Sequence, residues 1–510
     1  MTRSVPTRPS DERGDRSDRR PDAQPGVVSG ATPQTNKWVV FAIVAVGVFM
    51  STLDSSIVNI SLPTIASFFH VPLSGAVEWV IIVYLVVIAA TLLTIGRVAD
   101  MTGRKNIWAA GLAIFTAGSA LCGAAPSLSF LIAARAFQAI GGSLLFAVSA
   151  AMLTAAFPPN ERGRVLGMNA LVVALGISVG PTLGGFITQY LTWRWIFYVN
   201  VPLGIIGVIA TLRVLRETRP GGRGQFDPWG AMLLTIGLAS ITLGLSFGQE
   251  WGWSSPTLIV TLVLGVAALA TLLVVERRVA SPIVPLGLLK DRVFASANLS
   301  LILSFLALFA VSFMMPFYLE QLRNFSLIES GLLLTPLPLT IAVIAPFSGR
   351  LADRIGTRWL AASGLAIACV GLVFISDLRA NSSVFDIVWP LVVTGFGQAL
   401  FQSPNNSALM GSAPRTAQGV ASGFLATGRV IGQSTSVALA GAVFTCLGGA
   451  LAGARLDGLY HGQGPRSYPP GYLTALQSTF VSAFHATFLV CAAVAVIGVF
   501  ASLVRGKENR

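Results

Sequence analysis

Long apolar stretches without charge recur along this chain, each close to the length that a lipid bilayer requires. A membrane-spanning helix needs about 20 consecutive, mostly apolar residues, and the chain is 54% hydrophobic and only 11% charged. The pattern predicts an all-α integral membrane protein, because helices satisfy their own backbone polar groups in hydrocarbon. Fourteen windows meet the length criterion, at 38–62, 77–96, 106–125, 128–156, 165–188, 195–215, 228–248, 257–276, 293–319, 329–348, 359–376, 384–411, 420–452 and 479–504.

The distribution of positive charge gives the orientation of these spans. A net charge of +13 could indicate nucleic-acid binding, but the lysines and arginines gather in alternate loops, which face the cytoplasm under the positive-inside rule. An even number of spans also places both termini on one side. We therefore expect a multi-pass plasma-membrane protein with both termini cytoplasmic and no nucleic-acid partner. The basic loops contain Arg97, Arg104, Lys105, Arg162, Arg164, Arg213, Arg216, Arg219, Arg223, Arg277, Arg278, Lys290, Arg292, Arg350, Arg354 and Arg358.

The ends of the chain and its reactive side chains add few constraints. Residues 1–36 are polar and rich in Arg and Asp, which predicts a disordered cytoplasmic tail, and residues 505–510 are expected to form a second, short tail. The first residues lack the apolar core of a cleaved signal peptide, so the first span is expected to remain in the protein. The 4 cysteines and 3 histidines suggest neither a disulfide framework nor a metal site, and no cofactor is expected.

The chain repeats part of its own sequence. GRVADMTGRK at 96–105 returns as GRLADRIGTR at 349–358, and FQAIG at 137–141 loosely resembles GQALF at 397–401. These echoes predict two homologous halves of six spans, which bind substrate between them near mid-membrane. Four glycines recur at a constant offset: Gly163, Gly167, Gly176 and Gly185 return as Gly419, Gly423, Gly432 and Gly441. The predicted divisions are the halves at 37–220 and 281–504 and two inserted helices at 221–280.

The repeated decapeptide lies in a loop that is predicted to face the cytoplasm. Gly96 and Gly103 allow a tight turn, and Asp100 is placed to face a helix N-terminus or to pair with Arg104. Such a loop could latch the two halves together and release them as they rock. The alternative is a solvated turn whose charges only set the topology, which the recurrence of the motif makes less favoured. The predicted gating-loop residues are Gly96, Asp100, Gly103, Arg104, Lys105, Asp353 and Arg354.

Two opposite charges lie inside apolar windows, Asp54 in the first and Arg135 in the fourth. Ionisable residues inside a membrane are costly and usually functional. At 1.5 Å per residue, Asp54 lies about 12 Å and Arg135 about 9 Å below the outer ends of their spans. We hypothesise that they pair, because pairing relieves the cost of burying each charge. The alternative for Arg135 is an extended side chain that reaches the interface.

The fifth window contains ALGISVGPTLGGF at 174–186. Small residues spaced four apart let helices approach closely, and a proline bends the helix. The matching place in the second half has Ser436 and Val437, so packing in both halves does not require the Gly-Pro pair. This favours a hinge or seal over a packing kink alone. The predicted hinge residues are Gly176, Gly180, Pro181, Gly184 and Gly185.

An aromatic stretch, TWRWIFYVNVPLG at 192–204, opens the sixth window. Trp193, Trp195 and Tyr198 are predicted to form an aromatic belt at the membrane interface, and Asn200 and Pro202 are expected to break the helix locally. An anchoring role is favoured over contact with substrate.

Together these motifs resemble those of a known family. GRVADMTGRK is similar to the cytoplasmic loop motif of the major facilitator superfamily, and the stretches around Asp54, Arg135, the span-5 glycines and the aromatic stretch resemble motifs of its fourteen-span drug:proton antiporters, which are multidrug resistance exporters. The resemblance covers nearly the whole chain after the first tail. It implies the major facilitator fold, a bacterial inner-membrane location, proton coupling through Asp54 and Arg135, and a Gly-Pro motif of the kind associated with antiport. Arg429 matches an arginine often found in the corresponding span.

One departure from that family concerns the substrate. Some relatives that export dicationic antiseptics carry acidic residues deep in span 10, whereas LLLTPLPLTIAVIAPF at 332–347 has none. Spans 12 and 13 offer amides instead, which suits neutral, zwitterionic or monocationic lipophilic compounds. The predicted cavity residues are Gln138, Gln398, Gln402, Asn405, Asn406, Arg429 and Gln433.

The predicted function is proton-driven antiport that exports lipophilic drugs or toxic small molecules by alternating access, in a monomer surrounded by membrane lipids. Burial favours the protonated form of Asp54, whereas a contact with Arg135 favours the ionised carboxylate. If this contact forms in only one of two conformations, Asp54 binds a proton in the other conformation and releases it when the contact forms.

The alternatives are an exporter of lipids, glycolipids or endogenous metabolites, and a scaffold or sensor that does not transport. Without a catalytic triad, metal cluster or phosphate loop, an enzyme is not expected. The outer loop at 453–476 is expected to be solvated.

Overall fold

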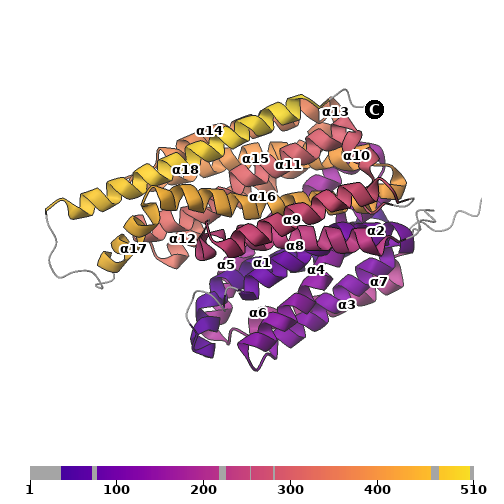
Figure 1. The fold of residues 1–510 in the computed structure, drawn as a ribbon, viewed down its shortest axis with the longest axis horizontal. Coiled ribbons are helices and arrows are strands. Elements are labelled where there is room, and N and C mark those ends of the chain that lie inside the picture. The colour runs from indigo at the N-terminus through magenta and orange to yellow at the C-terminus, as the bar shows by residue number, and fades with distance from the viewer. Residues whose placement is uncertain are drawn as a thin grey trace, which may run out of the picture. The chain divides into compact units, whose positions relative to one another are not determined.

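The computed structural model describes residues 36–71, 77, 79–216, 226–252, 254–279, 282–460 and 470–505, which form a bundle of long helices (Figure 1). The predicted domain boundaries at 220/221 and 280/281 and most of both tails lie outside the described residues. The α-helices are α1 (Lys37–Phe69), α2 (Trp79–Thr102), α3 (Arg104–Gly123), α4 (Leu128–Ala156), α5 (Arg162–Tyr190), α6 (Trp195–Tyr198), α7 (Asn200–Val214), α8 (Pro228–Trp251), α9 (Pro256–Glu276), α10 (Leu286–Lys290), α11 (Arg292–Phe317), α12 (Leu327–Leu334), α13 (Pro336–Ile355), α14 (Arg358–Ser376), α15 (Val384–Ser412), α16 (Gln418–Cys446), α17 (Gly449–Tyr460) and α18 (Tyr472–Leu503).

These helices confirm the predicted spans. Among the described residues, 13 helices are long and apolar enough to cross a membrane, and a bent pair raises the number to 14. The bent pair joins α16 to α17 at 76°, so the window predicted at 420–452 ends sooner than expected. The prediction of a solvated outer loop at 453–476 is wrong in part, because α17 continues to Tyr460 and buries Gly453 and Leu456, and α18 begins at Tyr472. Residues 461–469 lie outside the described part of the chain.

The internal repeat appears as a repeated packing pattern. In the first half, α2 and α3 each pack against α4, α1 packs against α5, and α3 packs against α7. The second half repeats these pairs with α13 and α14 against α15, α11 against α16, and α14 against α18. The inserted helices α8 and α9 pack on each other, and α8 also contacts α2 and α16. The structure therefore contains two six-helix halves and two additional helices.

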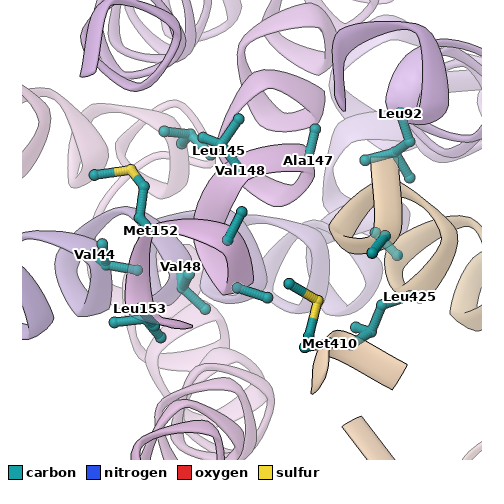
Figure 2. Close-up of a cluster of buried hydrophobic side chains, with 14 of the residues drawn as sticks. Val44, Val48, Leu92, Leu145, Ala147, Val148, Met152, Leu153, Met410 and Leu425 are labelled. Carbon is teal, nitrogen blue, oxygen red and sulfur yellow. The ribbon is translucent and has the colours of Figure 1, made fainter. Parts of the chain in front are cut away.

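A shared apolar core joins the two halves. Val48 of α1, Leu92 of α2 and Leu145 of α4 belong to the same cluster of buried side chains as Met410 of α15 and Leu425 of α16, and Figure 2 shows them converging. Burial of apolar area is worth roughly 25 cal/mol per Å² when the area leaves water, but lipid is as apolar as leucine. Van der Waals packing therefore has to hold such a bundle together.

Paired glycines bring the halves into backbone contact. Gly96 of α2 faces Gly419 of α16, and Gly349 of α13 faces Gly163 of α5. A Cβ atom at Gly96 would lie 2.8 Å from the carbonyl carbon of Gly419, which is too close for two carbon atoms. Small residues are needed here because only they allow such close helix approach.

We predict that Gly96→Ala separates these helices and lowers stability, since overpacking typically costs about 1–3 kcal/mol. The apparent melting temperature of the purified protein in detergent measures this. Gly411→Ala is the matched control, because no atom lies within 4 Å of a Cβ at that helical glycine. Equal melting temperatures for the two variants would contradict the contact.

Candidate functional site

The two charges expected at similar depth form an ion pair in the structure. Arg135 Nη1 of α4 lies 2.5 Å from Asp54 Oδ2 of α1, and their side chains are 1% and 0% exposed. This confirms the hypothesis that they pair and rules out an Arg135 side chain that extends to the interface. An ion pair in such surroundings is stable only when hydrogen bonds satisfy the remaining polar atoms of both partners.

Further contacts around this pair come from α4 itself and from three other helices, α2, α3 and α7. Gln138 of α4 donates from Nε2 to Asp54 Oδ1 at 2.8 Å and to the Ser119 hydroxyl of α3 at 2.7 Å, and its Oε1 accepts from Arg135 at 2.7 Å. Asn200 of α7 donates to the same Asp54 oxygen at 3.2 Å. Arg135 Nε donates to the carbonyl of Val80 in α2 at 3.0 Å. The carboxylate is thus held by three side-chain donors from two helices.

An aromatic ring completes the surroundings of the guanidinium. The Cζ atom of Arg135 lies 4.2 Å from the centre of the Tyr84 ring, a cation–π contact that is worth more when both groups are desolvated. The Tyr84 hydroxyl itself is buried and has no hydrogen-bond partner among the described residues. We call Asp54, Arg135, Gln138, Asn200, Ser119 and Tyr84 the Asp54 cluster.

Sequence analysis missed part of this cluster. Asn200 was expected only to break the helix, and Gln138 was placed in a substrate cavity, yet both are fully buried against Asp54. The break itself is present, since α6 ends at Tyr198 and α7 begins at Asn200. Trp193 is 3% exposed and packs on Phe68, Phe69 and Phe197, so its assignment to an interfacial belt was wrong. An amide deep in an apolar window was the available signal for Asn200.

The opposite side of the same stretch of α1 meets the glycines of α5. A Cβ at Gly176 would lie 3.2 Å from the backbone nitrogen of Leu53, and one at Gly180 would lie 3.1 Å from that of Ile57. The Ser56 hydroxyl donates to the Ile177 carbonyl at 3.0 Å. Helix α5 continues through Pro181, Gly184 and Gly185, and nothing lies within 4 Å of a Cβ at Gly185. Two of the predicted hinge glycines therefore face α1 beside Asp54.

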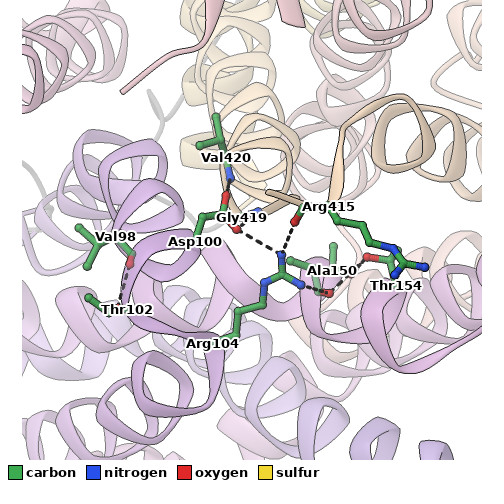
Figure 3. A network of polar contacts seen from close by, with 10 residues as sticks. Val98, Asp100, Thr102, Arg104, Ala150, Thr154, Arg415, Gly419 and Val420 are labelled. Atoms are coloured by element: carbon green, nitrogen blue, oxygen red, sulfur yellow. Dashed lines mark hydrogen bonds and ion pairs between the residues drawn. The ribbon is translucent and has the colours of Figure 1, made fainter. Parts of the chain in front are cut away.

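The gating-loop aspartate joins the halves, as Figure 3 shows. Asp100 at the end of α2 accepts hydrogen bonds from the backbone N–H groups of Gly419 at 2.8 Å and Val420 at 3.1 Å, which belong to the first turn of α16. A carboxylate at a helix N-terminus satisfies unpaired N–H groups and interacts favourably with the helix dipole. Arg104 pairs with Asp100 at 3.2 Å and donates to the carbonyls of Ala151 and Arg415. Both predicted roles of Asp100 are present.

The second copy of the motif makes the mirror contact. Asp353 of α13 accepts from the N–H groups of Gly163 at 2.8 Å and Arg164 at 3.0 Å, in the first turn of α5. We call the end of the bundle with Asp100 and Asp353 the aspartate face. Lys105 donates there to the Leu212 carbonyl at 3.2 Å, and Arg354 is exposed in the last turn of α13.

The two glycines of the loop have different roles. Gly103 has φ 104°, a left-handed conformation that favours glycine in a tight turn. Gly96 lies inside α2, so the expectation that it helps to form the turn was wrong, and its function is the close contact with Gly419. The sequence feature that could have indicated this contact is the spacing of four residues between Gly96 and Asp100, which places both on one side of a helix.

The last residue of the described chain completes the second copy. Thr357 occupies the position that Arg104 has in the first copy. Arg505, two residues after the end of α18, donates to the Thr357 hydroxyl at 3.1 Å and to Asn405 of α15, and it is fully buried. Asn405 in turn donates to the Ala297 carbonyl of α11 at 2.9 Å. Arg505, which was assigned to the second tail, is therefore buried against the bundle, and Asn405, which was predicted to line a substrate cavity, makes buried contacts with Arg505 and α11.

The remaining predicted cavity residues are dispersed over α15 and α16. Gln402 and Asn406 are buried, whereas Gln398, Arg429 and Gln433 keep part of their surface accessible. An open cavity of about 400 Å³ lies elsewhere, at the end of the first half away from the aspartate face. It is lined by Thr64, Ser67, Phe68, Thr188, Leu191, Thr192, Trp193 and Arg194. Within the described ranges, no group of three or more acidic, cysteine or histidine side chains is arranged to hold a metal ion.

Two repeated six-helix halves with an ion pair buried inside one of them define a polytopic membrane transporter. A family model described as Major Facilitator Superfamily matches residues 44–235 and 228–437, and the chain belongs to that superfamily. It is therefore a transporter and not an enzyme.

Relatives of this chain are named for different roles. The riboflavin transporter RibZ of Clostridioides difficile (strain 630) is 36% identical over 395 residues, which are 77% of this chain and 84% of RibZ. The multidrug resistance protein Stp of Mycobacterium tuberculosis (strain ATCC 25618 / H37Rv) is 32% identical over 398 residues, which are 78% of this chain and 74% of Stp. The solved structure of the human organic anion transporter MFSD10 (TETRAN) covers 90% of this chain and 99% of its own, with a TM-score of 0.61 and 14% identity. That last likeness concerns the fold alone.

We predict that Arg135→Met destabilises the protein by about 3–5 kcal/mol, because it leaves the Asp54 carboxylate buried without its cation. The double variant Asp54→Asn/Arg135→Met is expected to recover much of this loss. Thermal unfolding of wild type, both single variants and the double variant gives the coupling energy. Additive effects of the two substitutions would contradict a direct ion pair.

We also predict that Arg505→Ala loosens the second half, and that Thr357→Arg compensates for it. An arginine at position 357 would stand where Arg104 stands in the first copy. Resistance of the α13–α14 loop to limited proteolysis measures the effect, with Arg379→Ala as a control at an exposed arginine. A loop that is cleaved at the wild-type rate in Arg505→Ala would exclude the contact.

Proposed function

We propose that this protein is a proton-coupled exporter of small organic molecules, and that Asp54 carries the proton. The observation that supports this is the Asp54 cluster: a fully buried carboxylate with Arg135 as its cationic partner at 2.5 Å. A scaffold gains nothing from a buried charge, since replacing such a pair by apolar side chains is often neutral or stabilising. A proton-coupled transporter, by contrast, requires a buried carboxylate that can change its protonation state.

The proton moves as the contact between Asp54 and Arg135 forms and breaks. Protonation neutralises Asp54 and removes the attraction, while deprotonation restores it. A conformational change that separates the two side chains therefore favours proton uptake, and one that reunites them favours release. Gln138 and Asn200 keep the carboxylate oriented, because both donate to the same oxygen, Oδ1. In the present conformation the pair is formed.

Helix α1 connects this chemistry to the movement of the halves. One side of α1 carries Asp54, and the other packs on Gly176 and Gly180 of α5. The beginning of α5 is held by Asp353 of the second half. Rocking of the halves that breaks this contact would shift α5 against α1 and change the surroundings of Asp54. The two aspartate contacts close the predicted cytoplasmic face, so the present conformation corresponds to a state closed toward the cytoplasm.

The comparisons support two kinds of substrate. The multidrug resistance relative, at 32% identity, favours export of lipophilic drugs or toxic compounds, which is our main proposal. The riboflavin transporter, at 36% identity, supports a second candidate, the transport of a flavin-like metabolite by the same mechanism.

We predict that Asp54→Asn abolishes active export and leaves an inserted, folded protein, because an amide cannot bind and release the proton. Everted membrane vesicles from a host depleted of its own pumps are loaded by an imposed proton gradient, with a panel of lipophilic drugs and riboflavin as probes. Uptake by wild type that an uncoupler removes is the expected result.

Asp377→Asn is the matched control, since this carboxylate is 68% exposed. Wild-type export by Asp54→Asn vesicles would contradict the assignment of the proton carrier. Uncoupler-sensitive uptake of riboflavin alone would select the metabolite candidate. Uptake of no probe, with both proteins present in the membrane, would point to a lipid or glycolipid.

A further inference from the structure

Arg429 is a buried arginine without an acidic partner. It lies in α16, and the contact that the structure records for it is with the ring of Phe305 in α11, 5.4 Å from its Cζ atom. Among the described residues it has no ion pair, and its Nε is buried without a hydrogen-bond partner. Arg135 of α4, which is also buried within a span, has Asp54 as its counter-ion. Arg429 lacks any such counter-ion within the described chain.

The position of Arg429 along α16 is near the middle of the membrane. It follows Gln418, the first residue of the helix, by 11 positions, or about 16 Å at 1.5 Å per residue. The hydrocarbon core is about 30 Å thick, so the guanidinium cannot reach water at either surface along the helix. Yet part of its surface remains accessible although it lies deep in the bundle, which is typical of a side chain at an internal cavity.

The helix geometry also gives the direction in which Arg429 points. Ser422, Arg429 and Gln433 are spaced by seven and four residues, which places them on one stripe of α16. The Ser422 hydroxyl donates to the Phe146 carbonyl of α4 in the first half, at 3.4 Å. A different side of α16, with Gly428 and Gly432, packs on α11. Arg429 therefore lies on the side of α16 that faces the boundary between the halves.

An unpaired cation at mid-membrane, at the boundary where such transporters bind substrate, needs a negative charge to offset its desolvation. We propose that the substrate supplies it: Arg429 binds the anionic group of a lipophilic organic anion, such as a carboxylate, beside the Phe305 ring. A guanidinium recognises a carboxylate with two parallel hydrogen bonds. This inference rests on the proposed transport function and replaces the expectation of neutral or monocationic substrates with that of an anionic class.

The test uses two probes with the same xanthene skeleton and opposite charge, the anion fluorescein and the cation rhodamine 123. Binding to the purified protein in lipid nanodiscs is measured by equilibrium dialysis, and uptake by everted vesicles is measured after extraction at fixed pH. We expect wild type to bind fluorescein at least tenfold more tightly than rhodamine 123. Arg429→Gln should remove that preference, and Arg429→Lys should retain most of it. Arg379→Gln, at an exposed arginine, should behave like wild type.

The two measurements separate this inference from the proposed function. Preferential binding of fluorescein that depends on Arg429 would support the inference, even where vesicles do not transport the probe and the transport proposal fails. Equal or tighter binding of rhodamine 123 by wild type would overturn the inference, even where uncoupler-sensitive export is found. An equal loss of both probes in Arg429→Gln and Arg429→Lys would also overturn it, since that result indicates a structural role.

Discussion

The structure depends on the cost of placing a charge where neither water nor lipid can solvate it. Asp54 and Arg135 are tolerated inside the first half because each satisfies the other and because Gln138, Asn200 and backbone groups complete their hydrogen bonds. The same requirement acts at the aspartate face, where Asp100 and Asp353 satisfy the N–H groups that begin α16 and α5. In a bundle this apolar, every compensated charge also fixes the position of two helices relative to each other.

The aspartate contacts follow the internal repeat but connect opposite halves. Each half supplies one aspartate at the end of its second span and one helix start at its fifth. The glycine pairs beside them bring the backbones close enough for these hydrogen bonds to form. Two copies of one short sequence thus produce two equivalent contacts between the halves. A movement that opens the aspartate face has to break both contacts.

Spans and repeat could be predicted because they depend on local composition and spacing. The apolar windows, the decapeptide and the constant glycine offset required no knowledge of which helices touch. The pairing of Asp54 with Arg135 was also accessible, since depth follows from residue counting. The partners of Gln138, Asn200 and Asn405 were not, because a polar residue in an apolar window shows that it must be satisfied without showing by what. The roles of Gly96 and Trp193 were misjudged for a related reason: close packing between helices distant in sequence decides whether a residue lies in a turn, at an interface or in a core.

The buried Arg505 has a consequence for the order in which this protein folds. In the first half, Arg104 follows Asp100 by four residues, so that corner can form as soon as the third span has been synthesised. The second half takes its corresponding cation from Arg505, which follows α18. Thr357 and Asn405 therefore acquire this partner only after α18 has been synthesised. The chain enters the membrane with one half able to complete its polar contacts early and the other dependent on its last helix. A chain truncated before Arg505 would leave Thr357 and Asn405 without this contact, whereas its first half would retain the Asp100–Arg104 pair.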